Sequence, residues 1–168
     1  QYTGGTTGVS KGAILLNRNV LANIQQNDAW STPVMNQPEM PDQLTYVCAL
    51  PLYHIFSLTI CALSGMQKGA HNLLITNPRD IPAFVKDLSR QPFHVFPGLN
   101  TLFVALMNNA EFRNLDFSQL LMTFAGGMAM QRAVAEEWQD LTGVKISEGY
   151  GLSETAPTVT SNRLDTSE

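Results

Sequence analysis

Short apolar runs alternate with helical patterns along this chain. Five runs rich in branched and aromatic residues indicate strands at 44–50, 72–76, 93–96, 120–125 and 144–147. Apolar residues at helical spacing indicate helices at 81–88, 99–107 and 130–141, the last ending at Gly143. Strands with a helix between them are typical of right-handed crossover units. The sequence therefore predicts an α/β protein with a mostly parallel sheet and flanking helices.

The composition indicates a globular and rather apolar protein. Hydrophobic residues make up 44% of the 168 residues and charged residues 14%, unlike a disordered tail. So few charges suggest that other segments of a longer chain cover part of this surface. The net charge is −4, and the scattered Lys and Arg residues form no basic stripe, which argues against nucleic acid as a partner.

The two cysteines and the lengths of the apolar runs bear on location. Cys48 and Cys61 lie in apolar surroundings and are expected to be free, buried thiols of a reducing, cytoplasmic compartment. No run approaches the ~18 apolar residues that a membrane span requires. Any membrane contact is therefore expected to be peripheral.

Two segments show no clear periodicity. Residues 27–42 hold three prolines and many amides and are predicted to form a surface connection. Residues 155–168 are predicted to be irregular and partly mobile.

A glycine- and threonine-rich segment, YTGGTTGVSKG at 2–12, predicts a phosphate-binding loop. Its glycines (Gly4, Gly5, Gly8) leave backbone N–H groups accessible, its threonines (Thr3, Thr6, Thr7) add hydroxyl donors, and Lys11 adds a mobile charge. A flexible linker is the simpler alternative, but linkers rarely alternate Gly and Thr and end in Lys-Gly. Two better-known motifs fail on spacing, because the P-loop needs Gly before its lysine and the dinucleotide fingerprint needs Gly at position 3.

This loop resembles the phosphate-binding signature of the adenylate-forming enzymes, which include acyl-CoA synthetases, luciferases and peptide-synthetase adenylation domains. Gly4 and Ser10 depart from the commonest form of the signature, where Ser or Thr and Pro are frequent. Neither departure removes Lys11 or the hydroxyls. The resemblance implies that the loop grips the departing pyrophosphate of ATP.

Residues 51–56, PLYHIF, resemble the second signature of the same family. The resemblance implies that His54 lies near the substrate carboxylate and the acyl channel. A lone histidine would more often be a core residue held by hydrogen bonds, and that interpretation is kept for His71 and His94. No histidine pair has the spacing of a metal site.

Residues 148–155, EGYGLSET, resemble the third signature. The resemblance implies that Tyr150, between Gly149 and Gly151, stacks on the adenine, that Ser153 contacts the α-phosphate and that Glu154 binds Mg²⁺. A carboxylate beside a phosphate needs a bridging cation, which agrees with the role of Glu154. A serine hydrolase is the rival interpretation, but Thr155 replaces the last glycine of its nucleophile motif and no histidine follows.

The strand predicted at 120–125 ends in Ala125-Gly126-Gly127-Met128, and the resemblance places this segment at the nucleotide and acyl pockets. Glycine at the carboxyl edge of a sheet allows a ligand to approach the backbone. A tight strand-to-helix turn would need the same residues. The segment 98–101 occupies the equivalent place after an earlier strand, and its role stays open.

The order of these segments looks most like that of bacterial long-chain fatty acid–CoA ligases. The resemblance implies that the whole chain, 1–168, is an internal part of the large AMP-binding N-terminal domain, with the phosphate loop at 2–12, pocket segments at 50–58 and 125–129, and the adenine and Mg²⁺ segment at 148–155. It implies ATP, AMP, Mg²⁺ and coenzyme A as ligands and a fatty acid as substrate. The C-terminal lid domain is expected beyond residue 168, so these residues alone are expected to be inactive.

Some alternatives stay open from the sequence. Phe56, Leu58, Leu102 and Met128 are candidates for an acyl tunnel or, equally, ordinary core residues. A medium-chain or aryl acid ligase and a non-catalytic nucleotide-binding module are the other functions considered. Location is expected to be cytoplasmic, with any contact at the inner membrane peripheral, and the sequence does not indicate an oligomeric state.

Overall fold

A six-stranded sheet carries the molecule, in the order β4-β3-β5-β6-β7-β8. The computed structural model describes residues 1–3, 11–36 and 40–164. The sheet strands are β3 (Thr45–Cys48), β4 (His71–Leu74), β5 (Val95–Gly98), β6 (Met122–Ala125), β7 (Ile146–Gly151) and β8 (Thr158–Ser161). The first five pair in parallel and β8 pairs antiparallel with β7. The predicted strands, and the mostly parallel sheet, are confirmed.

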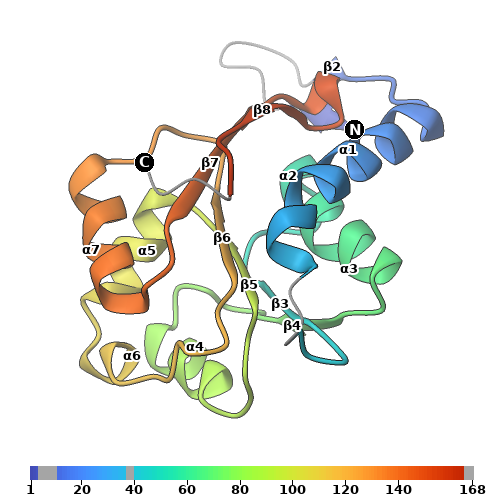
Figure 1. Ribbon diagram of the computed structural model, residues 1–168. Coiled ribbons are helices and arrows are strands. Elements are labelled where there is room, and N and C mark those ends of the chain that lie inside the picture. The colour runs from blue at the N-terminus through green and yellow to red at the C-terminus, as the bar shows by residue number, and fades with distance from the viewer. Residues whose placement is uncertain (4–10, 37–39, 165–168) are drawn as a thin grey trace.

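Helices cover both faces of this sheet, as Figure 1 shows. One face carries α1 (Asn17–Met35), α2 (Ile55–Ser57), η1 (Leu58–Leu63) and α3 (Ser64–Gln67). The other carries α4 (Ile81–Leu88), α5 (Asn100–Met107), α6 (Ala110–Arg113) and α7 (Arg132–Thr142). The α7 helix ends at Gly143 with a φ of 77°, which confirms the predicted left-handed terminator.

The main core lies between the sheet and the helices α4, α5 and α7. Trp138 and Phe103 are fully buried, with ring centroids 4.6 Å apart, and the Trp138 indole donates to Thr123 Oγ1 at 3.1 Å. A smaller cluster under α1 and η1 includes Tyr46, Cys48, Cys61, Val95 and Met122. Both cysteines are free and buried, as predicted, and a hydrogen bond with Cys61 together with burial raises the pKa of Cys48.

The prediction of a surface connection at 27–42 is wrong for its first part, because α1 continues to Met35. Pro33 lies in the last turn of this helix, where the missing N–H costs less than in the middle. The hydroxyls of Ser31 and Thr32 both donate to the carbonyl of Asp28 at 3.0 Å. Amides along α1 also pair with distant backbone, so tertiary contacts replace the missing apolar periodicity.

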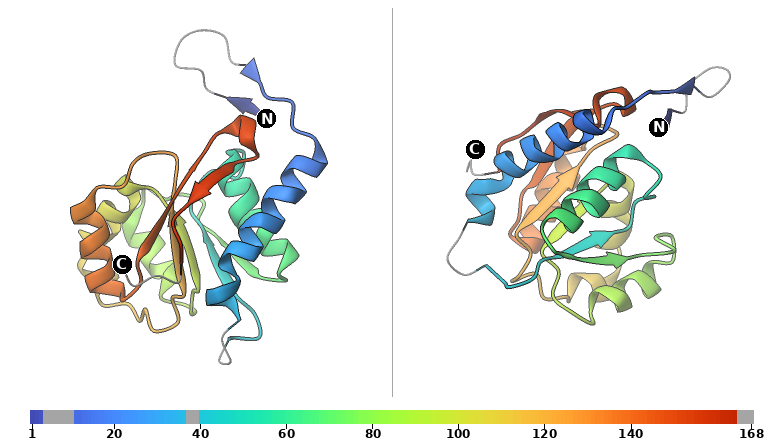
Figure 2. Two further views of the ribbon diagram at one scale, coloured as in Figure 1. Left: turned by 45° about the horizontal axis from the view of Figure 1, so that its top comes forward. Right: turned by 90° about the vertical axis from the view of Figure 1, so that its right-hand side faces the viewer.

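The prediction for 155–168 is also wrong in part, since β8 forms within it. The Asn23 side chain of α1 donates to the carbonyl of Thr158 at 2.8 Å and accepts from its N–H at 3.2 Å. The indole of Trp30 donates to the carbonyl of Asn162 at 2.9 Å. These bonds fix β8 between β7 and α1, an arrangement visible in Figure 2. Residues 165–168 lie outside the described part.

The helix that follows β3 has an unusual middle. Its residues run through α2, η1 and α3 without a break, and η1 is π-helical. The hydroxyl of Thr59, which is fully buried, donates to the carbonyl of Ile55 at 2.6 Å. Single π-helical turns inside α-helices often mark functional sites.

His94 links β3 and β5 through a buried hydrogen bond, which makes stability depend on pH. The ring Nδ1 accepts from the N–H of Thr45 at 2.8 Å, and burial lowers the pKa of His94 below 6.5. The unfolded chain therefore takes up this proton at higher pH than the folded protein. Stability is retained above about pH 6.5 and falls as the pH drops toward the folded pKa, with a slope of at most about 1.4 kcal/mol per pH unit.

We expect His94→Gln to reduce this loss of stability between about pH 7 and pH 5, measured by urea unfolding at each pH. The exposed His71 provides the matched control. The explanation would be wrong if His71→Gln changed the pH slope as much as His94→Gln did.

Candidate functional site

The carboxyl ends of β3, β5, β6 and β7 meet at one edge of the sheet. The chain leaves β3 toward α2 on one face and leaves β5 toward α5 on the other, although the two strands are neighbours. Such a switch in direction opens a crevice, and open α/β sheets bind their ligands there. The predicted segments 50–58, 125–129 and 148–155 all follow these strands.

Gly126 brings three of the segments into contact. A side-chain carbon placed on Gly126 would lie 3.4 Å from the Phe56 ring and 3.4 Å from the carbonyl oxygen of Gly149. Gly127 follows with a φ of 79°, a conformation that favours glycine. Met128 is more than half exposed at this turn. The tight turn and the close approach of segments are thus both present.

Two hydrogen bonds that the sequence did not indicate order the loop after β6. Glu148 Oε2 accepts from the N–H of Met130 at 3.2 Å, and Asn100 Oδ1 accepts from the N–H of Gln131 at 3.0 Å. Asn100 is buried at the start of α5. Its role, open from the sequence, is therefore at least to join the β5 loop to the β6 loop. Only the place of both residues immediately after strands could have pointed to this function.

His54 stands at the N-terminus of α2 and is exposed. Its Nδ1 accepts from the N–H of Phe56 at 3.3 Å, so in the neutral ring the proton is assigned to Nε2. An Nε2–H group facing solvent can donate to a carboxylate or phosphate oxygen. The local fold thus fixes the ring as a hydrogen-bond donor.

The 148–155 segment is held in place by its own backbone and by β8. A side-chain carbon on Gly151 would lie 2.0 Å from the carbonyl oxygen of Pro157, so only glycine fits. The Thr155 hydroxyl contacts the carbonyls of Leu152 and Pro157, and the N–H of Leu152 donates to Thr155 Oγ1 at 2.9 Å. The short helix η2 (Ser153–Thr155) follows and leaves Glu154 exposed.

The predicted phosphate loop is described only at its two flanks. Gly4, Gly5, Thr6, Thr7 and Gly8 lie outside the described residues. The flanking strands β1 (Tyr2–Thr3) and β2 (Lys11–Gly12) pair antiparallel, with Thr3 opposite Lys11. Gln1 Nε2 donates to the carbonyl of Tyr53 at 2.7 Å. The hairpin is therefore joined to the segment that carries His54.

Exposed aromatic and apolar side chains gather along the same segments. Tyr53 is 82% exposed, Tyr150 60% and Met128 52%, and Tyr2 is exposed on β1. Flat rings left in solvent beside Gly127 and Glu154 offer a surface on which a planar ligand can stack. The predicted tunnel residues divide: Phe56 and Leu58 are half-buried near this edge, whereas Leu102 belongs to the core on the opposite face.

No group of three or more His, Cys, Asp or Glu side chains within residues 1–3, 11–36 and 40–164 could hold a metal ion by itself. A cation at Glu154 would therefore need further oxygen ligands from a bound phosphate. Over the same ranges, no helix has both the length and the apolar character needed to cross a membrane.

Comparison with known proteins agrees with this geometry. A family model described as "AMP-binding enzyme" matches residues 1–168. The chain belongs to the AMP-binding enzyme family. Within the family, it is 54% identical over 165 residues to a long-chain-fatty-acid–CoA ligase of Yersinia pestis, and 31% identical over 163 residues to one of Bacillus subtilis.

The AMP-binding chain spans 98% of its own length but only 29% of the Yersinia relative, and 96% against 28% for the Bacillus relative. The fold also matches a solved structure, the anthranilate CoA ligase AuaEII in complex with anthranoyl-AMP. The TM-score is 0.80 at 24% identity, over 96% of this chain and 30% of that one. This likeness confirms the fold of an adenylate-forming domain.

Proposed function

We propose that the protein containing this sequence is a long-chain fatty acid–CoA ligase. In this reaction a fatty carboxylate attacks the α-phosphate of ATP, pyrophosphate leaves, and the acyl group then passes from AMP to the thiol of coenzyme A. The convergence of the His54, Gly126 and Tyr150 segments at one sheet edge carries the proposal. Relatives of that printed activity, 54% identical across this chain, support it.

The nucleotide is assigned to the 148–155 segment and the hairpin. Tyr150 stacks on adenine, because its ring is largely exposed beside glycines that leave room for a flat ligand. Ser153 donates to the α-phosphate and Lys11, exposed on β2, offsets charge on the leaving pyrophosphate. The five glycines and threonines between β1 and β2 supply N–H and hydroxyl donors to the same group.

The fatty acid is assigned to the crevice between His54 and Gly126. The Nε2–H of His54 orients the carboxylate, and the contact between Gly126 and Phe56 marks where the apolar tail enters the protein. Gly126 and Gly127 allow substrate to approach the backbone. Met128 lies exposed beside them as part of the wall.

Glu154 fits a magnesium ion shared with the nucleotide. Its carboxylate is exposed on η2, and Mg²⁺ in nucleotide sites is commonly held by one or two carboxylates plus phosphate oxygens. Bound there, Mg²⁺ would neutralise charge on the phosphates. We also propose a role in fatty acid metabolism and a cytoplasmic location, with peripheral membrane contact because the substrate partitions into lipid.

The nucleotide assignment is tested by isothermal titration of ATP into the full-length protein with and without Mg²⁺. We expect Tyr150→Ala to weaken binding about tenfold, the usual scale for a lost base-stacking ring. Glu154→Gln should weaken binding only when Mg²⁺ is present, and Lys11→Ala should weaken it in both conditions. Glu111→Gln, an exposed glutamate on α6, is the matched control.

Two outcomes would overturn the proposal. Binding that is unchanged in all three site variants would remove the nucleotide from this edge of the sheet. ATP–pyrophosphate exchange in the full-length protein that does not depend on any fatty acid would remove the fatty acid as substrate.

A further inference from the structure

Strand β6 presents an apolar column to the face covered by α1 and η1. Alternate residues of a strand point to the same face, so Met122, Phe124 and Gly126 lie in one line. Gly126 opens at the candidate site, against the Phe56 ring. Met122 stands at the other end of the strand, about 13 Å away at the rise of a β-strand. The column therefore leads from the site to the amino-terminal edge of the sheet.

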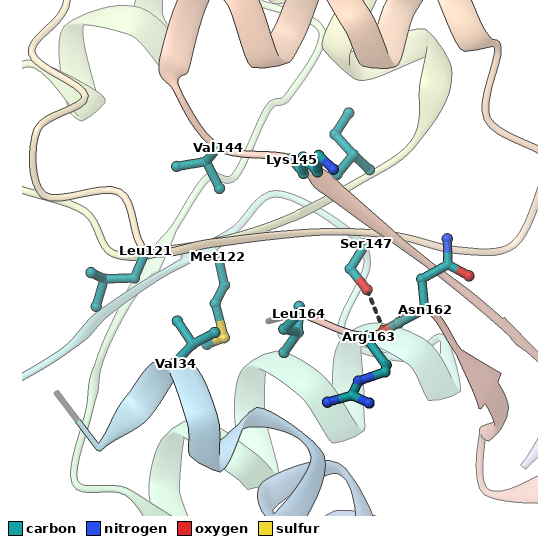
Figure 3. A pocket seen from close by; sticks show the side chains of 10 residues that line it. Val34, Leu121, Met122, Val144, Lys145, Ser147, Asn162, Arg163 and Leu164 are labelled. Carbon is teal, nitrogen blue, oxygen red and sulfur yellow. Dashed lines mark hydrogen bonds between the residues drawn. The ribbon is translucent and has the colours of Figure 1, made fainter. Parts of the chain in front are cut away.

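Two cavities follow this column. The smaller, about 30 Å³, lies between α1, the π-helical turn and the sheet, and its wall includes Ile60, Phe124 and Met122. The larger, about 380 Å³, lies at the amino ends of β6 and β7, as Figure 3 shows. Its apolar wall includes Met122, Val34 and Leu164. Among the residues that line the two cavities, Met122 and no other is common to both.

The size and chemistry of the larger cavity fit the end of an apolar chain. Its volume falls in the range of small-molecule pockets, about 300–1,000 Å³. Val144 and Ile146 complete an apolar interior, while the polar Ser147 and Asn162 and the charged Lys145 and Arg163 stand in its wall from β7 and the segment after β8.

We infer that Met122 divides the acyl path and sets the length of chain that the enzyme accepts. The side chain is 2% exposed and stands between the small cavity, which continues from the site, and the large one beyond it. Methionine is unbranched and flexible, so it can fill the gap with a short chain bound and move aside for a longer one. This inference rests on the proposed function, because it assumes that an acyl tail enters at Gly126.

The size of the residue at position 122 should therefore change the chain-length profile. Each methylene group that gains a buried place adds about fourfold to binding. Met122→Ala joins the two cavities, and we expect the ratio of kcat/KM for stearate to that for laurate to rise about tenfold. Met122→Trp fills the passage, and the same ratio should fall about tenfold while activity with laurate is retained.

The test uses the full-length protein, with pyrophosphate release measured for both acids. Met107→Ala is the matched control, because Met107 is 3% exposed but packs on the opposite face of the sheet. Thermal unfolding of all three variants shows whether each is folded, and calorimetric binding of laurate and stearate gives a readout independent of turnover.

The outcomes separate the two levels of the proposal. If neither acid supports pyrophosphate release by the unsubstituted protein, the proposed function is wrong. If both acids support it and the ratio stays the same in folded Met122→Ala and Met122→Trp, or moves equally in Met107→Ala, the role of Met122 is wrong.

Discussion

Trp138→Ala is expected to lower the free energy of unfolding by about 3–5 kcal/mol, the usual cost of deleting a large buried aromatic ring. The indole is fully buried, packs on Phe96, Phe103 and Phe112, and donates to Thr123 Oγ1. Alanine leaves a cavity and an unpaired buried hydroxyl. Because whole domains are stable by about 5–15 kcal/mol, the variant should be close to unfolding at physiological temperature. Urea unfolding followed by circular dichroism measures the loss.

Trp30 is the control, being the other tryptophan of the chain. It is 46% exposed and its indole donates to the carbonyl of Asn162. Trp30→Ala should cost about 1 kcal/mol or a little more, the scale of one hydrogen bond and partial burial. Equal losses for the two variants would show that the core does not lie where the structure places it.

Gly151→Ala is expected to abolish nucleotide binding at a modest cost in global stability. The added carbon would lie 2.0 Å from a backbone oxygen, and backbone cannot move aside as a flexible side chain can. The strand must therefore shift at the point where β7 and β8 already change register. Tyr150 on one side and Ser153 on the other would leave their positions. We expect ATP affinity to fall by at least about a hundredfold, because stacking and phosphate contacts are lost together.

Gly149 gives the comparison within the same motif. A carbon added there would lie 3.7 Å from its nearest neighbour, the carbonyl oxygen of Thr160, which is ordinary contact. Gly149→Ala should keep most of the affinity measured by calorimetry. If Gly149→Ala and Gly151→Ala bound ATP equally well, the steric account of this segment would be refuted.

The parallel sheet could be predicted because its strands are buried on both faces. Strands β3 and β5 are continuous apolar runs, and α4, whose apolar residues repeat at helical spacing, begins at the expected Ile81. Glycine at 143 marks a helix end for a local reason, its positive φ. In these elements the sequence signal and the tertiary environment agree, so local reasoning was sufficient.

The elements that were missed depend on distant partners. Asn23 is a polar residue in the middle of α1, and its buried amide is satisfied only by Thr158, 135 residues away in sequence. Strand β8 in turn depends on that amide and on Trp30. Neither pairing leaves a periodic trace in the local sequence. Likewise, the bond from Glu148 to Met130 could not be read from either segment alone.

The candidate site was found through short motifs rather than through periodicity. The segments around His54, Gly126 and Tyr150 lie in one region, as the resemblance implied. Their detailed roles remain predictions, and the glycines and threonines at 4–8 lie outside the described residues.

The π-helical turn at Leu58–Leu63 makes this helix sensitive to chain length rather than to composition. A π turn is equivalent to one extra residue in an α-helix, so removing a residue there would leave an unbroken helix. Everything after the deletion would rotate by about 100° relative to what precedes it. Lys68 would then turn away from Asp28 on α1, its ion-pair partner, while His54 kept its place. A one-residue gap in an aligned sequence at this turn would therefore signal a repacked contact between two helices, although the alignment alone would present it as a minor change.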